Sequence, residues 1–203
     1  MSNIKDANVT MRRHWKHWDT LFNHEFSKES DRASVILSAS MLDQVLETIL
    51  RSCFCPTTSA DDPLLDGANA PLSTFASRID ACYRIGMISA KLCRDLHIIR
   101  KVRNEFAHNV TGCTFDSAGV RNRILELTRS SDICQTLPEK RIQFPEGPKG
   151  DFQITVSMFL THLWILAEGI TQYSPKTTEF IYSVEFWKHI REKNDEEKVE
   201  PGA

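Results

Sequence analysis

The feature that most limits the fold is the spacing of apolar residues, which recur every three or four positions along most of the chain. The clearest case is the segment 31–54, and its apolar series is Ile36, Ala39, Leu42, Leu46, Ile49 and Cys53. This period is that of one face of an α-helix, whereas a half-buried strand alternates with a period of two. The sequence contains no alternating segment and no internal repeat. The pattern therefore predicts an all-α protein.

Similar patterns predict the other helices. Ser89 is a suitable N-cap for one of them, and Gly86 is placed to end the helix before it. We expect helices at about 11–26, 31–54, 71–86, 89–111, 116–129, 152–173 and 180–190, with a mostly irregular segment at 130–150. The predicted organisation is a single helical domain over 11–190, a bundle with additional N- and C-terminal helices whose core spans about 29–173. A flexible N-terminus (1–10) and a charged, disordered tail (191–203) flank it.

Composition excludes several classes of protein. With 41% hydrophobic and 26% charged residues among 203, the chain is not broadly disordered. A net charge of −2 and the absence of a helix-turn-helix spacing or a basic recognition helix argue against direct binding of duplex DNA. No secretory signal opens the chain, and polar residues interrupt its most hydrophobic stretch, 152–170. We therefore expect a cytoplasmic protein without membrane contact.

No motif for a metal or a cofactor is present. The six cysteines are scattered without a CxxC or a paired Cys/His spacing, so reduced thiols are expected. His14 and His17 stand three apart, a spacing that a metal could use, but an aromatic helix docking on the core explains them equally well. Because phosphate loops and the common hydrolase motifs are also absent, we expect no cofactor and no metal.

The segment 98–108 carries the residues best suited to chemistry. Arg103 offers a permanently charged, planar guanidinium group suited to phosphate oxygens, and His108 offers an imidazole, the kind of side chain that can take or give a proton. Together with Asn104 they could promote attack of a 2′-hydroxyl on its neighbouring phosphodiester, a reaction open to RNA and closed to DNA, without a metal. Arg100 and Lys101 are the candidate substrate-binding cations.

Helix geometry sets a condition on this site. At about 100° per residue, Arg103 and His108 lie about 140° apart on a straight helix, whereas Asn104 and His108 share a face. The pair meets only if the arginine reaches round, if the helix ends near Ala107, or if a second subunit supplies one partner in a two-fold dimer. Alternatively, the cations simply complement the helix dipole.

Two acidic residues on the helix 31–54, Asp43 and Glu47, lie four apart and face one way. They form a solvated face unless a basic residue meets them. Arg78 and Asp80 flank the inward Ile79, and a structural ion pair accounts for these two residues as well as a functional role does.

Five blocks in order resemble the mannitol operon repressor (MltR) family. The resemblance covers about 29–110, and a weaker similarity extends over 152–166. The five blocks are 29–33 (ESDRA), 41–47 (MLDQVLE), 64–75 (LLDGANAPLSTF), 78–88 (RIDACYRIGMI) and 99–108 (IRKVRNEFAH). The resemblance implies a transcriptional regulator, which without a DNA-binding helix would act through a protein partner.

Arg103-Asn104-x-x-x-His108 also resembles the R-x4-6-H signature of HEPN domains. These are four-helix bundles that often dimerise, and many are metal-independent ribonucleases of toxin–antitoxin and defence systems. The resemblance implies that Arg103 and His108 form the catalytic pair, that Asn104 supports them, and that Asp43 is the acidic residue of an earlier helix. The leading hypothesis is thus a homodimeric, HEPN-like endoribonuclease with an antitoxin or regulator as partner. The alternative is a non-catalytic regulator of the MltR type.

Overall fold

The computed structural model describes residues 13, 16–18, 20, 26–109, 112–131, 144–175 and 184–196. Within these ranges all regular structure is helical and no strand occurs, which confirms the all-α prediction. The chain divides into two compact units, Met1–Gln172 and Tyr173–Ala203. The predicted flexible segment 1–10, His14 and most of the irregular segment 130–150 lie outside the described residues.

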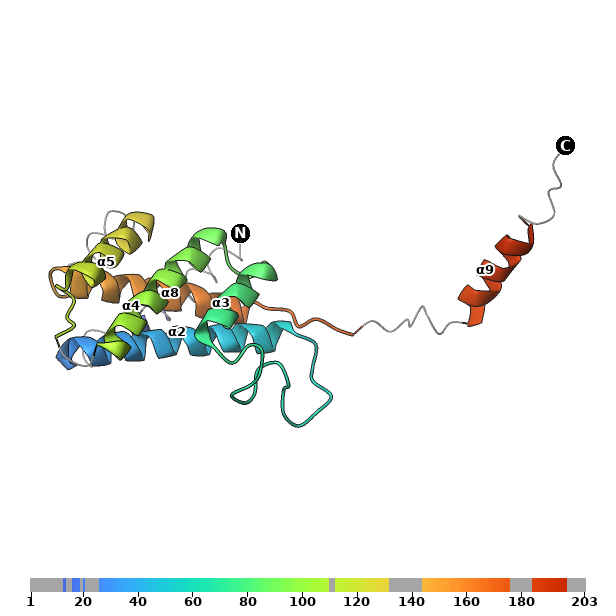
Figure 1. Cartoon of the computed structure of the whole chain (residues 1–203), viewed down its shortest axis with the longest axis horizontal. Coiled ribbons are helices and arrows are strands. Elements are labelled where there is room, and N and C mark those ends of the chain that lie inside the picture. Colours follow the sequence, from blue (N-terminus) through green and yellow to red (C-terminus); the bar gives the residue numbers. More distant parts are fainter. Residues whose placement is uncertain are drawn as a thin grey trace. The chain divides into compact units, whose positions relative to one another are not determined.

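Four helices of the first unit form a bundle in which each packs against two neighbours (Figure 1). The pairs in contact are α2 with α4, α4 with α5, α5 with α8, and α8 with α2. A fifth helix, α3, packs against both α2 and α4, and a short 3-10 turn, η1, packs against α2. The bounds are η1 Phe26–Lys28, α2 Asp31–Cys53, α3 Phe75–Arg84, α4 Ala90–His108, α5 Ala118–Ser131 and α8 Pro148–Glu168.

Side-chain caps fix where three of these helices begin. The Ser30 hydroxyl accepts from the Ala33 N–H at 3.2 Å, and the Ser89 hydroxyl accepts from the Leu92 N–H at 3.2 Å. Thr74 and Ser77 form a reciprocal capping box at the start of α3. Each cap satisfies an N–H that has no acceptor within its own helix. The start of α4 was predicted from this chemistry, and the structure confirms it.

Several helix boundaries differ from the prediction. Helix α8 begins at Pro148, not near 152, because a proline is well suited to the first helical position, where its missing N–H costs nothing. The same helix ends at Glu168, before Pro175. In the second unit, α9 runs over Val184–Glu196 and so continues past the expected end at 190, while 197–203 lie outside the described residues.

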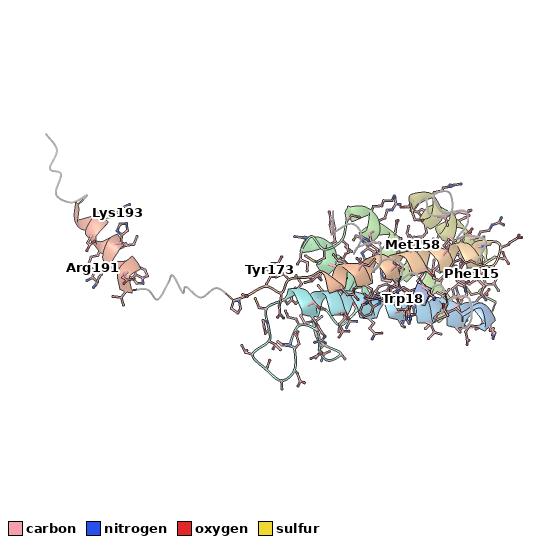
Figure 2. All side chains as sticks on the ribbon, turned by 180° about the vertical axis from the view of Figure 1, so that it is seen from behind. Trp18, Phe115, Met158, Tyr173, Arg191 and Lys193 are labelled. Carbon is pink, nitrogen blue, oxygen red and sulfur yellow. The ribbon has the colours of Figure 1, made fainter. Side chains whose placement is uncertain are left out.

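Helix α8 is buried on nearly all sides along its first half, as expected of a helix at the centre of a core. Near its start Phe152 lies 5.5 Å, ring centre to ring centre, from Phe115, which lies 5.6 Å from Phe106 of α4. Phe115 marks the end of the bundle where α2 begins (Figure 2), and its N–H donates to Asp31. Trp18, also labelled there, is buried in the same core.

Contacts near the ends of the helices set their directions. Lys149 of α8 donates to the Glu29 carbonyl at 2.9 Å, so α2 and α8 begin side by side and run the same way (Figure 1). At the start of α2, the Arg32 guanidinium donates to the carbonyls of Phe106 and Asn109 at the end of α4. Helix α4 therefore runs antiparallel to α2, which brings the middle of α2 opposite 100–104.

Among the described helices, α2 is long and apolar enough by length and composition to cross a membrane. Half of its apolar window is buried inside the fold, as is usual for the core helix of a bundle. Its half-buried acidic residues, Asp43 and Glu47, pair with Arg78 of α3. The burial of its apolar face and these ion pairs are those expected of a core helix.

Candidate functional site

A polar cleft of about 330 Å³ opens between α2, the start of α3 and the second half of α4. Four of the six residues predicted for the site line it. They are Asp43 from α2 and Arg100, Arg103 and Asn104 from α4. The remaining lining comes from Ala39 and Ser40 of α2 and from the segment 73–76.

The α4 side of the cleft is cationic. Arg100, Arg103 and Asn104 are three and four positions apart and so share one face of the helix. The Arg103 guanidinium donates to the Asn104 side-chain carbonyl at 3.2 Å, and Arg100 donates to the His97 ring at 3.4 Å. The ion pairs formed among the described residues include neither arginine, so both charges are available to a bound group.

On the α2 side, Asp43 is held by a buried arginine. The guanidinium of Arg78 donates to Asp43 at 2.8 Å and lies 2.7 Å from Glu47, while its Nε donates to the Leu72 carbonyl at 2.9 Å. Glu47 in turn pairs with Arg51 at 2.8 Å. A basic residue therefore meets the two acids, so they do not form a simple solvated face.

Opposing influences act on the pKa of Asp43. Burial raises this pKa above its ordinary value and is the largest effect. The hydrogen bond and the charge of Arg78 lower it, Glu47 raises it, and Arg103 lowers it slightly. The last effect means that Asp43 and Arg103 lie near enough across the cleft to interact electrostatically.

The start of α3 forms the third wall of the cleft, and the residue pattern alone did not predict it. Phe75 and Ala76 occupy the first two helical positions after the N-cap Thr74, where backbone N–H groups have no acceptor within the helix. The partial positive charge of a helix N-terminus therefore adds to the two arginines. The capping pattern Thr74-x-x-Ser77 was the available signal, but only the tertiary fold brings it opposite Arg103.

Two predicted site residues do not line the cleft. His108 is exposed at the last position of α4, one turn beyond Asn104, and Lys101 is exposed on α4 without reaching the lining. The end of α4 is capped by Arg32, which donates to its terminal carbonyls, so a basic residue from another helix fills the role of complementing the dipole. Within one chain, the described contacts do not join His108 to Arg103.

The arrangement is suited to receiving an anionic group. Two guanidinium groups, which form no ion pair with the described residues, and a helix N-terminus face one carboxylate that Arg78 already neutralises. Asp43 is the one carboxylate among the described residues that line the cleft, and Arg78 engages it. Among the described residues that line the cleft, none carries an imidazole that could exchange a proton with a substrate bound there.

Comparison with known proteins supports the fold. No family model matches the chain, and no curated protein matches it. Among solved structures, the X-ray structure of the MtlR-HPr complex from Escherichia coli is similar, with a TM-score of 0.53 and 15% sequence identity. The match covers 74% of this chain and 98% of that chain. It confirms the MltR-like fold that the sequence blocks implied.

Proposed function

We propose that the protein is a regulator that acts by binding a protein partner, and that the cleft receives an anionic side chain of that partner. The observation that carries this proposal is the separation of the predicted catalytic pair. Arg103 lines the cleft, whereas His108 is exposed beyond it at the end of α4. The described lining of the cleft therefore has the groups that bind an anion, and it includes no imidazole that would transfer a proton.

The fold supports the same proposal, because MtlR, a protein of similar fold, forms a complex with HPr. In this chain the guanidinium groups of Arg100 and Arg103 project from one face of α4, a geometry suited to binding a carboxylate or a phosphate group. Arginines of this kind are over-represented among the residues that dominate the binding energy of protein interfaces.

Isothermal titration of the full chain with the HPr protein of its own source organism tests the proposal. We expect saturable binding that Arg103→Ala weakens by about 10-fold or more, since a dominant interface arginine contributes about 2 kcal/mol. Arg100→Ala should weaken it in the same direction.

Lys101→Ala is the matched control, because Lys101 carries the same charge on the same helix and does not line the cleft. Its affinity should stay within about 2-fold of the unaltered chain, since rim charges contribute little at moderate salt. Equal losses for Lys101→Ala and Arg103→Ala would contradict a role for the cleft. No binding by the unaltered chain would exclude HPr as the partner.

An RNA-directed endoribonuclease is the second candidate, and its specific support is that Arg103, Asn104 and Asp43 line one cleft. In that case His108 of a second copy would have to complete the site, which requires a homodimer. Incubation with single-stranded RNA and EDTA separates the two proposals. The regulator proposal predicts no cleavage. Cleavage that both Arg103→Ala and His108→Ala abolish would overturn it in favour of the nuclease.

A further inference from the structure

Outside the cleft, three side chains of metal-binding type meet on the surface between α3 and α4. Asp80 comes from α3, and Cys93 and His97 come from α4. One ligand atom of each, a carboxylate oxygen, the thiol sulfur and a ring nitrogen, lies within 4.8 Å of the other two. The closest approach is 3.0 Å, between His97 Nε2 and an Asp80 carboxylate oxygen.

The helix spacing explains why the cluster forms. Cys93 and His97 are four positions apart on α4, so their side chains project from one face in adjacent turns. The packing of α3 against α4 places Asp80 over the same face. A hydrogen-bonded Asp80–His97 pair alone would be an ordinary surface contact, but the thiol adds a third donor atom of a different kind.

We propose that Asp80, Cys93 and His97 form a binding site for Zn²⁺. Zinc is held in proteins by this combination of sulfur, nitrogen and oxygen ligands, whereas Mg²⁺ and Ca²⁺ require oxygen ligands. Tetrahedral zinc with bond lengths of about 2.0–2.3 Å separates its ligand atoms by about 3.3–3.6 Å. The cluster reaches this geometry when the exposed Asp80 side chain and the partly exposed thiol shift slightly.

Three protein ligands leave a fourth position, which water fills in sites of this type. On binding, zinc displaces the Cys93 thiol proton to solvent and forms a zinc–sulfur bond. The carboxylate of Asp80 exchanges its hydrogen bond with the histidine ring for a bond to the metal. The site therefore needs no group beyond the three side chains and water.

The contacts of His97 connect this site to the cleft. A carboxylate only accepts, so Nε2 carries the ring proton toward Asp80, and Nδ1 accepts from Arg100 at 3.4 Å. When zinc takes the lone pair of Nε2, the ring proton moves through solvent to Nδ1, which then cannot accept from an arginine. Zinc binding thus releases Arg100, which also lines the cleft. The metal site itself does not depend on what the cleft binds.

Cobalt titration of the full chain, kept reduced with a phosphine, tests the site. Cobalt(II) replaces zinc, and its bond to a thiolate produces a charge-transfer absorption band together with the intense visible bands of a tetrahedral ion. We expect these bands to saturate with a single ion per chain and to disappear when zinc is added.

Cys93→Ser should abolish the charge-transfer band, and His97→Ala should weaken binding by about 100-fold or more, beyond the 10–100-fold typical of outer-shell changes. Asp80→Asn keeps the shape of the side chain and should weaken binding by at least about 10-fold. The matched controls are Cys55→Ser and His162→Ala, which alter an exposed cysteine and an exposed histidine elsewhere.

Absence of the thiolate band, or equal affinity of Cys93→Ser and Cys55→Ser, would overturn the site. The link to the cleft has a separate readout in the nitrogen NMR signals of the His97 ring. The proton should lie on Nε2 in the metal-free chain and on Nδ1 in the zinc-bound chain. An unchanged tautomer with zinc bound would refute the release of Arg100.

Discussion

Replacing Arg78 by alanine removes the cation that joins three structural elements. Arg78 is 8% exposed, and it contacts Asp43 and Glu47 of α2 and the Leu72 carbonyl before α3. The variant leaves Asp43 half-buried without its cation. Glu47 keeps a second partner in Arg51, so it loses less.

The size of the effect follows from burial. Removing one partner of a fully buried ion pair costs about 3–5 kcal/mol, because the other charge is left uncompensated. Here the Asp43 and Glu47 side chains are 28% and 29% exposed, so water replaces part of what Arg78 supplied. We therefore expect Arg78→Ala to lower the free energy of unfolding by about 2–4 kcal/mol.

Arg51→Ala provides the matched comparison, because Arg51 contacts the same Glu47 but its side chain is 38% exposed. Exposed ion pairs contribute about 0–1 kcal/mol each, and Arg51 pairs with Asp62 and Asp66 as well as Glu47, so this variant should lose about 1–2 kcal/mol at most. Arg78→Met retains most of the apolar stem and separates the loss of charge from the loss of packing. If the loss of charge dominates, Arg78→Met should lower the free energy of unfolding by nearly as much as Arg78→Ala.

The loss of stability caused by Arg78→Ala should also become smaller as the pH is lowered. The direction of this pH dependence follows from the pKa of Asp43. Burial already raises the folded-state pKa of Asp43 above its ordinary value of 3.8. Ionised Asp43 therefore destabilises the fold at neutral pH, and protonation relieves this as the pH falls through the raised pKa. Removing Arg78 raises that pKa further, so the penalty of the variant is largest near pH 7 and shrinks as Asp43 is protonated.

Urea denaturation followed by circular dichroism, at about pH 7 and about pH 4, measures these differences. On heating, a loss of 3 kcal/mol corresponds to a decrease in Tm of about 6–12 °C for a chain of this length. The reasoning is refuted if Arg78→Ala costs no more than Arg51→Ala at neutral pH, or if its cost grows on acidification.

Three further predictions concern the core, a helix cap and the thiols. Phe106→Ala, which opens a cavity in the aromatic contact with Phe115, should cost about 3–5 kcal/mol in the same denaturation assay, and a loss below about 1 kcal/mol would contradict its burial. Ser89→Ala removes the cap of α4 and should cost about 1 kcal/mol, with Ser89→Gly costing only a few tenths. Burial raises the pKa of the Cys82 thiol to about 12. Near pH 8 a thiol reagent should therefore label the exposed Cys55 readily and Cys82 only on unfolding. Equal labelling rates of the two cysteines in the native chain would contradict the burial of Cys82.

Local chemistry predicted much of the fold. The period of the apolar residues gave the helices of the bundle, and the hydroxyl of Ser89 located the start of α4 within a residue. The start of α8 was missed because Pro148 was interpreted as part of an irregular segment, although a proline both interrupts helices and begins them. Sequence alone does not distinguish these two uses.

The candidate site was predicted in part. Arg103, Asn104 and Asp43 were named from the sequence and lie together, since the antiparallel packing of α2 and α4 brings their middles into register. The role of Arg78 depends on a contact across 35 positions of the chain, and periodicity does not encode such a contact. Likewise, His108 matches a motif by spacing, but one further turn of α4 carries it out of the cleft.

The central claim is that a protein partner docks on the cleft, and hydrogen exchange tests it most directly. The first-turn amides of Phe75 and Ala76 have no acceptor within α3, so they should exchange rapidly in the free chain. When HPr is bound, we predict slower exchange in a peptide covering 71–76 and unchanged exchange in the exposed loop 55–61. Unchanged exchange at 71–76 while HPr is bound would place the partner elsewhere and contradict the account.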